Sequence, residues 1–532
     1  MSWELIATTK RQALKDSIPA EWVIPAAIFP PEDQLDVTTF PRESGFFTER
    51  ELEITSISAI TILSHLSSGS WTSEEVTKAF CKAAAVAQQL TNCLSEIFFD
   101  KAIAQAKELD VYFQQTGKTK GPFHGLPISL KDNFNYIGYD STIGFTSLVD
   151  KPATYNSTIV DLLLETGAVL YCKTNVPTAM MISESVNNLF GRTVNPQNRS
   201  LTTGGSSGGE SALIAFGGSR LGVGSDIGMY QVAPLRMPAA CTGTFTIRAS
   251  AGRFPNFRSR ACLEGQESII GVSGPIAKTL EEIHHYRPTT LDPRPEMPPI
   301  PWRSVELKKT LKIGVLWNDG FVSPTPPVAR GLKETVEKLK AAGHEIVTWP
   351  PAEHMEMLIT LGRLFLADGG KSVRDLLEPT GEPFRPEMKP YEDAKELSVH
   401  DLWQIHVKRN ALCKSYLDRW NEAGIDALLG PTTPYSSVEN GNFAYAGYTC
   451  VFNLLDYPAV SFPCGAKADK SIDTPYTDHQ ALSDMDGKIQ KDLLDSADSV
   501  HGMPVSLQLV SRRLEEEKLF AMTDVILKAA AL

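Results

Sequence analysis

A run of glycines and serines between residues 202 and 250 holds the side chains best suited to acyl-transfer chemistry. Ser206 and Ser207 stand between two pairs of glycines, at 204–205 and 208–209. Glycine permits positive φ angles and a close approach of the backbone, so such a turn can present hydroxyls and free backbone N–H groups together. A reactive hydroxyl and N–H donors for a developing oxyanion are what acyl transfer requires.

The segments around these serines predict the elements that hold them. The run Glu210–Phe216, which two glycines follow, predicts a short helix. Leu221–Ile227 predicts a short apolar strand that runs into Gly228, and Gly125–Lys131 predicts a buried strand that ends at a lysine. That lysine either extends to solvent or, if the site desolvates it and lowers its pKa, acts as a neutral base.

Several motifs of this chain resemble those of the amidase-signature family in order and spacing, and together they cover nearly the whole chain. They are HGLPISLKD at 124–132, NNLFGRTVNPQN at 187–198, GGSSGGE at 204–210, GSDIG at 224–228, RMPAACTG at 236–243 and HGMPVSLQLVSRR at 501–513. The first resembles the family's catalytic-lysine strand and the last its C-terminal strand. Segments such as GYDSTIGF and PIPWR look closest to the fungal acetamidase-like branch.

The resemblance implies a Ser–Ser–Lys triad and no cofactor. Lys131 would be the base, and Ser206 would be the bridging serine, in a cis peptide. Backbone N–H groups of the turn at 227–230 would form the oxyanion hole. The residues implied at the oxyanion hole and the binding site are Ile227, Gly228, Met229, Ser207 and Met180. A methionine such as Met180 is, however, more often a core residue.

The serine that should act as nucleophile is absent from its expected place. The resemblance places it just before the segment LRMPAA. Counting forward from Ser206, the position falls on Tyr230, and counting back from Arg236 it falls on Pro234. We interpret Tyr230 as the residue in the nucleophile position. Its oxygen lies further from the backbone than a serine oxygen, and Met229 replaces a glycine of the oxyanion turn, so we predict impaired hydrolysis.

Three functional hypotheses follow. The first is a serine-type amidase, a hydrolase of carboxylic amides, whose segment 228–235 reflects a misplaced splice boundary. The second is a pseudo-amidase that binds a small ligand in the former cleft without hydrolysing it. The third is an enzyme that uses Lys131 and Ser206 for acid–base chemistry, such as cyclisation or condensation, in a biosynthetic pathway. In each case the partner is a small-molecule amide or carboxylic acid derivative.

Composition excludes several other classes of function. The 532 residues carry a formal net charge of −12, from 51 Lys and Arg against 63 Asp and Glu, without a basic block. Nucleic acid and membrane surfaces are therefore not expected as partners. We find no apolar signal segment, no apolar run long enough to span a bilayer, and no C-x-x-C pair among the eight cysteines. These features predict a cytoplasmic protein with reduced thiols and no metal site.

The alternation of helical and strand-like segments predicts an α/β fold. Thr158–Glu165 has a helical pattern, and the strand-like run Ala168–Lys173 follows it directly. We predict a single αβα amidase-signature fold with a central mixed β-sheet surrounded by helices. Residues 1–60 would be an arm packed on the body, and residues 61–532 the amidase-signature domain. A homodimer is left open.

Overall fold

The computed structural model describes residues 1–228, 235–286, 300–474, 476 and 479–531. An 11-stranded sheet lies at its centre. From one edge to the other, its strands are β1 (Leu94–Ile97), β3 (Val169–Thr174), β2 (Pro127–Lys131), β8 (Leu221–Asp226), β10 (Val272–Ala277), β9 (Phe245–Arg248), β14 (Ala459–Lys467), β15 (Pro504–Val510), β13 (Ala427–Pro431), β11 (Lys312–Val315) and β12 (Glu345–Thr348).

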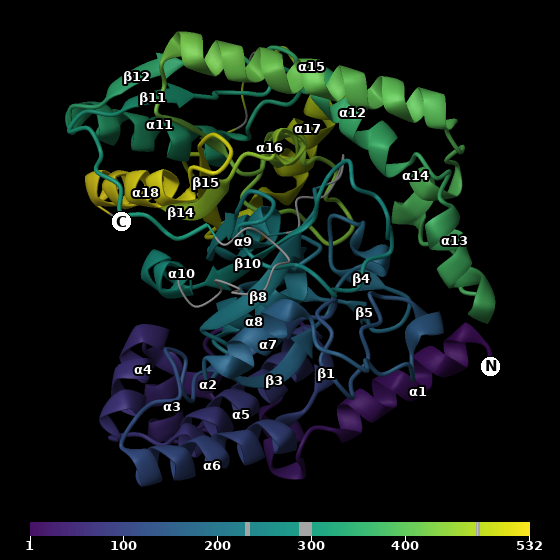
Figure 1. Ribbon diagram of the computed structural model, residues 1–532, viewed down its shortest axis with the longest axis vertical. Helices are drawn as coiled ribbons and strands as arrows, with labels where there is room; N and C mark the ends of the chain where they lie inside the picture. The colour runs from purple at the N-terminus through teal and green to yellow at the C-terminus, as the bar shows by residue number, and fades with distance from the viewer. Residues whose placement is uncertain (229–234, 287–299, 475, 477–478, 532) are drawn as a thin grey trace.

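Helices surround this sheet (Figure 1). Those of the N-terminal half are α1 (Trp3–Asp16), α2 (Phe40–Glu43), α3 (Glu49–Ser56), α4 (Ala59–Ser68), α5 (Ser73–Thr91), α6 (Phe99–Thr116), α7 (Thr158–Glu165), α8 (Gly208–Phe216) and α9 (Arg236–Thr242). The later ones are α10 (Leu280–Tyr286), α11 (Pro326–Ala341), α12 (His354–Phe365), α13 (Lys371–Leu377), α14 (Lys389–Glu392), α15 (Val399–Ala423), α16 (Gly447–Leu455), α17 (Asp484–Val500) and α18 (Glu516–Ala530). Two small sheets pair β4 (Val186–Asn187) with β5 (Gly191–Arg192) and β6 (Val194–Asn195) with β7 (Asn198–Thr202).

The sheet is mixed, and its parallel part positions the candidate site. Strand β2 pairs in parallel with both β3 and β8, and Leu130 is opposite Val223. Strand β8 then pairs antiparallel with β10. Parallel neighbours end at the same edge of a sheet, so the last residues of β2 and β8 lie side by side. The predicted α/β class, with a central mixed sheet surrounded by helices, is confirmed.

Helix α8 begins directly after the two serines and packs under the parallel strands. All of its residues are buried, and it contacts β2, β3 and β8. Gly222 of β8 allows this close approach, because a Cβ at that position would lie 1.7 Å from Oε1 of Glu210. The helix ends at Gly217, whose φ of +99° suits a residue without a side chain. The predicted helix is therefore present and begins two residues earlier than expected.

The first 60 residues contact the rest of the chain at several points. Lys10 on α1 donates a hydrogen bond of 2.9 Å to Asp140 and forms an ion pair with Glu96. The N–H of Val37 donates to the carbonyl of Pro196 at 2.9 Å. Apolar residues of this segment belong to the same buried cluster as the strands β2 and β3. The division into an arm and a domain remains a prediction from the sequence.

Two predictions about the chain as a whole can be compared with the structure. None of the eight cysteines, all of which the structure describes, forms a disulfide, and all except Cys413 are buried. Among the helices that the structure describes, none is both long and apolar enough to cross a bilayer.

Candidate functional site

Lys131 and Ser206 meet inside the protein. Lys131 is the last residue of β2, and Ser206 lies two residues before Gly208, the first residue of α8. Both side chains are 0% exposed, and the Lys131 Nζ donates a hydrogen bond of 2.7 Å to the Ser206 Oγ. The contact expected from the sequence is therefore present. A base and its proton partner must lie at such a distance for proton transfer.

Burial changes the acid–base behaviour of Lys131. Desolvation lowers the pKa of its ammonium group from 10.5 to about 7, although Asp226, Glu210 and Asp132 each act to raise it. The charged form loses more solvation energy than the neutral form when a lysine is buried. A substantial fraction of Lys131 is therefore unprotonated near neutral pH and able to accept a proton, as we expected for a desolvated lysine at this position.

The glycine-serine loop brings its hydroxyls to the end of β2. The peptide bond between Gly205 and Ser206 is cis, as the resemblance implied. A Cβ at Gly205 would lie 2.7 Å from the carbonyl oxygen of Ile182, so the loop passes too close to its neighbour for any other residue. Ser207 is also fully buried, and its Oγ donates to the carbonyl of Ser225 at 3.3 Å.

Ser225 is part of the site, and our sequence analysis missed it. The Lys131 Nζ donates to the Ser225 Oγ at 3.0 Å and to its carbonyl oxygen at 3.1 Å. Unlike Ser206, Ser225 is only partly buried. It is the second-last residue of β8, beside the last residue of β2, so the parallel pairing explains the contact. The motif GSDIG contained the signal, but we considered only its glycines and its place before the expected nucleophile.

A buried polar network supports the turn that follows β8. Asp226 accepts a hydrogen bond of 2.7 Å from the Asn453 side-chain amide and lies 3.5 Å from the Arg236 guanidinium. Arg236 donates to Asn453 at 2.5 Å. Gly228 has a φ of +63°, and a Cβ there would lie 2.0 Å from Cγ of Asn453. The network therefore packs directly against the backbone of the turn and limits its conformation.

Glu210 joins helix α8 to the strands that carry the site. Its carboxylate accepts hydrogen bonds from Ser129, two residues before Lys131, and from Thr174 at 2.7 Å. Burial raises the pKa of Glu210, which is fully enclosed. The charge of Glu210 acts in turn to raise the pKa of Lys131. Glu210 therefore both fixes the position of α8 and influences the protonation of the lysine.

The remaining predicted site residues are Ile227, Gly228, Met180, Met229 and Tyr230, and the structure describes the first three of them. Ile227 is partly buried and Gly228 is buried, both directly after β8. Met180 is 8% exposed, belongs to an apolar core cluster and has a φ of +61°, which is unusual for a residue with a side chain. Met229 and Tyr230, including the residue assigned to the nucleophile position, lie outside the described residues.

Within the ranges that the structure describes, no three His, Cys, Asp or Glu side chains are grouped so that they could hold a metal ion. The Lys131 Nζ is hydrogen-bonded to two hydroxyls, those of Ser206 and Ser225, and to the backbone carbonyl of Ser225. The carboxylates of Asp226, Glu210 and Asp132 act on Lys131 through their charge. Such a set suits proton transfer between hydroxyl groups and a neutral amine.

Comparisons with known proteins agree with this geometry. A family model described as Amidase matches residues 75–520. The chain is 39% identical to an acetamidase of Emericella nidulans over 546 aligned positions, covering 99% of this chain and 98% of that protein. It is 36% identical to an acetamidase of Aspergillus oryzae over 546 positions, with 99% and 98% covered. A solved fatty acid amide hydrolase matches with a TM-score of 0.92 at 31% identity, over 99% of this chain and 95% of that one.

Proposed function

Because the chain belongs to the amidase family, we propose that its site acts on small carboxylic amides through acid–base chemistry of Lys131 and Ser206. The observation that carries this proposal is the 2.7 Å hydrogen bond between the two buried side chains, together with the lowered pKa of the lysine. A base with a pKa near the working pH is the most effective proton acceptor. The relatives named acetamidase favour small amides as the substrate class.

The proposed reaction is acyl transfer in two halves. Neutral Lys131 takes a proton from Ser206, and Ser206 takes a proton from the attacking hydroxyl. The oxygen of that hydroxyl then bonds to the amide carbon. The carbonyl electrons move to oxygen, where N–H groups of the turn after Asp226 stabilise the negative charge. The C–N bond breaks, and the leaving amine receives the proton through Ser206. Water then attacks the acyl intermediate by the same proton route and releases the acid.

The attacking hydroxyl is the group of this reaction for which the chain has no serine at the expected position. Tyr230 occupies the expected nucleophile position in the sequence. We propose that hydrolysis is impaired for this reason, since members of such a triad act as a unit and loss of the nucleophile costs orders of magnitude. Ser225 offers a second hydroxyl, 3.0 Å from the Lys131 Nζ, and is the alternative nucleophile to be tested.

The alternative proposal is a function without hydrolysis. A pseudo-amidase would bind a small ligand in the former cleft, and a biosynthetic enzyme would use the same lysine and serine to move protons. The intact Lys131–Ser206 contact favours the second of these, because a site that only binds has no need of a buried lysine with a lowered pKa.

The deciding experiment measures turnover and covalent labelling together. The purified chain is incubated with short aliphatic and aromatic amides and, separately, with a serine-directed fluorophosphonate, followed by mass spectrometry. We expect little or no turnover and no stoichiometric label. Complete labelling of Ser225 or Tyr230, abolished by Lys131→Met, would show a working nucleophile and refute impairment. Binding of amides without turnover would support the pseudo-amidase.

A further inference from the structure

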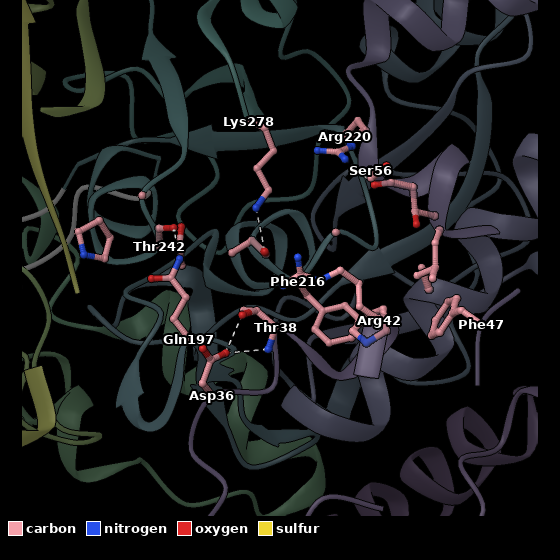
Figure 2. A pocket seen from close by; sticks show the side chains of 18 of the residues that line it. Asp36, Thr38, Arg42, Phe47, Ser56, Gln197, Phe216, Arg220, Thr242 and Lys278 are labelled. Carbon is pink, nitrogen blue, oxygen red and sulfur yellow. Dashed lines mark hydrogen bonds between the residues drawn. The ribbon is translucent and has the colours of Figure 1, made fainter. Parts of the chain in front are cut away.

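A second cavity lies apart from the site around Lys131. Its volume is about 1120 Å³, and it is bounded by residues 36–56, by the C-terminal end of α8 and by residues 501–504 before β15. None of the residues assigned above to the candidate active site lines it. Figure 2 shows this cavity, with Lys278 and Arg220 reaching toward it from the same side.

Of the positive side chains that line this cavity, Lys278 and Arg220 are partly buried and form no direct ion pair with the described residues. Lys278 follows the end of β10, and its Nζ donates a hydrogen bond of 2.8 Å to the carbonyl of Ala215 (Figure 2). Arg220 donates to the carbonyl of Thr55, and its Nε is buried without a hydrogen-bond partner. Neither side chain forms an ion pair with any residue that the structure describes. Positive groups removed from water without a partner anion are costly.

The carboxylate of Glu282 is hydrogen-bonded to the backbone and not to Lys278 Nζ or to the Arg220 guanidinium. Glu282 accepts hydrogen bonds from three backbone N–H groups, those of Ala59 at 2.8 Å, Lys278 at 3.1 Å and Thr279 at 3.0 Å. It acts on Lys278 and Arg220 only through its charge. Desolvation, together with the charge of Arg220, lowers the pKa of Lys278 to about 8, although the charge of Glu282 acts to raise it. Among the described residues, the Lys278 ammonium and the Arg220 guanidinium therefore donate to backbone carbonyls and not to a carboxylate.

Apolar and acidic side chains make up the rest of the cavity lining, and they determine which kind of anion fits. Apolar side chains of Phe47, Leu52, Phe216 and Met503 contribute to the wall. The acidic residues Asp36, Glu49 and Glu53 also line the cavity, on the N-terminal segment. Because the lining combines these carboxylates with positive and apolar side chains, a single negative charge on an apolar body suits it.

We propose that this cavity binds an organic carboxylate whose oxygens lie between Lys278 and Arg220 and whose apolar part lies along Phe47 and Phe216. The partly exposed guanidinium of Arg220 supplies a second positive charge at the cavity wall. Lys278 retains two further donors beyond the one given to Ala215. This binding site goes beyond the amide chemistry proposed above and does not depend on it.

The first test measures binding of octanoate by isothermal titration calorimetry to the full chain and to variants. Lys278→Gln keeps a donor for the Ala215 carbonyl and removes the charge, and Lys467→Gln is the matched control, because Lys467 is an exposed lysine at the same cavity. We expect Lys278→Gln to weaken binding by about tenfold to a hundredfold, the value of a charge-assisted hydrogen bond. Lys467→Gln should change it less than about threefold.

Neutral octan-1-ol serves as the probe without a charge. Equal affinity for octanoate and octanol, or equal affinity of Lys278→Gln and the unmodified chain for octanoate, would overturn the proposal. The same holds if octanoate does not bind. Binding at the site around Lys131 does not interfere with this comparison, since both variants leave that site unchanged.

A second test needs no variant and guards against misfolding. A lysine with a lowered pKa reacts readily with acetic anhydride, and mass spectrometry reports the extent of acetylation at Lys278. We expect octanoate to slow this modification at least fivefold at saturation, while octanol does not and Lys467 is unaffected by either. Unchanged acetylation of Lys278 in the presence of octanoate would refute the proposal.

Discussion

Restoring the family's nucleophile segment provides the most informative perturbation of this protein. Replacing residues 229–234 with Gly-Ser leaves Gly228-Gly-Ser-Leu235-Arg236, which gives the chain the Gly-Gly-Ser that the resemblance to the family implies before LRMPAA. The change returns a hydroxyl near Ser206, returns a glycine to the oxyanion turn and removes Pro234, which fixes the backbone. We expect the rate of amide hydrolysis to rise by about a hundredfold to ten-thousandfold, which is the contribution of general base catalysis alone.

The structure also sets the pH dependence of the restored activity. With a pKa of about 7, half of the Lys131 side chains are unprotonated at pH 7. An ordinary lysine would be unprotonated in only roughly one molecule in 3000 at that pH. The base must be neutral to act, so the rate falls as pH drops below 7 and levels off above it. Between pH 5 and pH 8 we expect kcat/KM to rise roughly a hundredfold.

The assay is the release of ammonia or aniline from short aliphatic and aromatic amides between pH 5 and pH 9. The control is the same replacement combined with Lys131→Met, which should remove the gain while the protein remains folded by circular dichroism. A gain that persists without the lysine, or a pH midpoint above about 9, would refute the role of Lys131 as a neutral base. An inactive but folded repaired protein would favour the non-hydrolytic proposals.

Three further predictions concern charges and packing around the site. Glu210→Gln removes a charge that raises the pKa of Lys131, so the pH midpoint of the repaired enzyme should move to lower pH; a shift upward would contradict the electrostatic argument. Gly222→Ala places a Cβ against the Glu210 carboxylate and should lower the free energy of unfolding by about 1–3 kcal/mol in urea titrations, whereas an unchanged midpoint would show that the helix can move. Lys10→Met leaves the largely buried Glu96 without its ion pair and should cost about 2 kcal/mol, and Glu96→Gln added to it should recover part of the loss.

Local patterns were sufficient for the elements that carry the site. The apolar run before Lys131, the glycines around Ser206 and the glycine after Phe216 each predicted a boundary that the structure shows within two residues. These predictions succeeded because strand burial, glycine conformation and helix termination depend on neighbouring residues. The α/β class followed from the same alternation of helical and strand-like segments.

Contacts between distant segments could not be obtained in this way. The motif GSDIG marks Ser225 as a candidate site residue but does not show that it reaches Lys131, 94 positions earlier in the chain, since that contact depends on the parallel pairing of β2 with β8. The same is true of Asn453, whose amide supports Asp226 from a helix 227 positions away. Polar residues inside apolar motifs were the available signal, and this signal does not identify the residues that they contact.

The sequence by itself determined which groups could do chemistry, because residue type and local backbone preference are properties of short segments. From the resemblance it also predicted that Tyr230 stands where the family's triad has its nucleophilic serine. The tertiary structure decided how those groups act. Only the fold buries Lys131 completely, which lowers its pKa, and only the fold leaves Lys278 and Arg220 together on a cavity wall. Desolvation and charge proximity depend on packing between elements far apart in the chain, and no local pattern contains them.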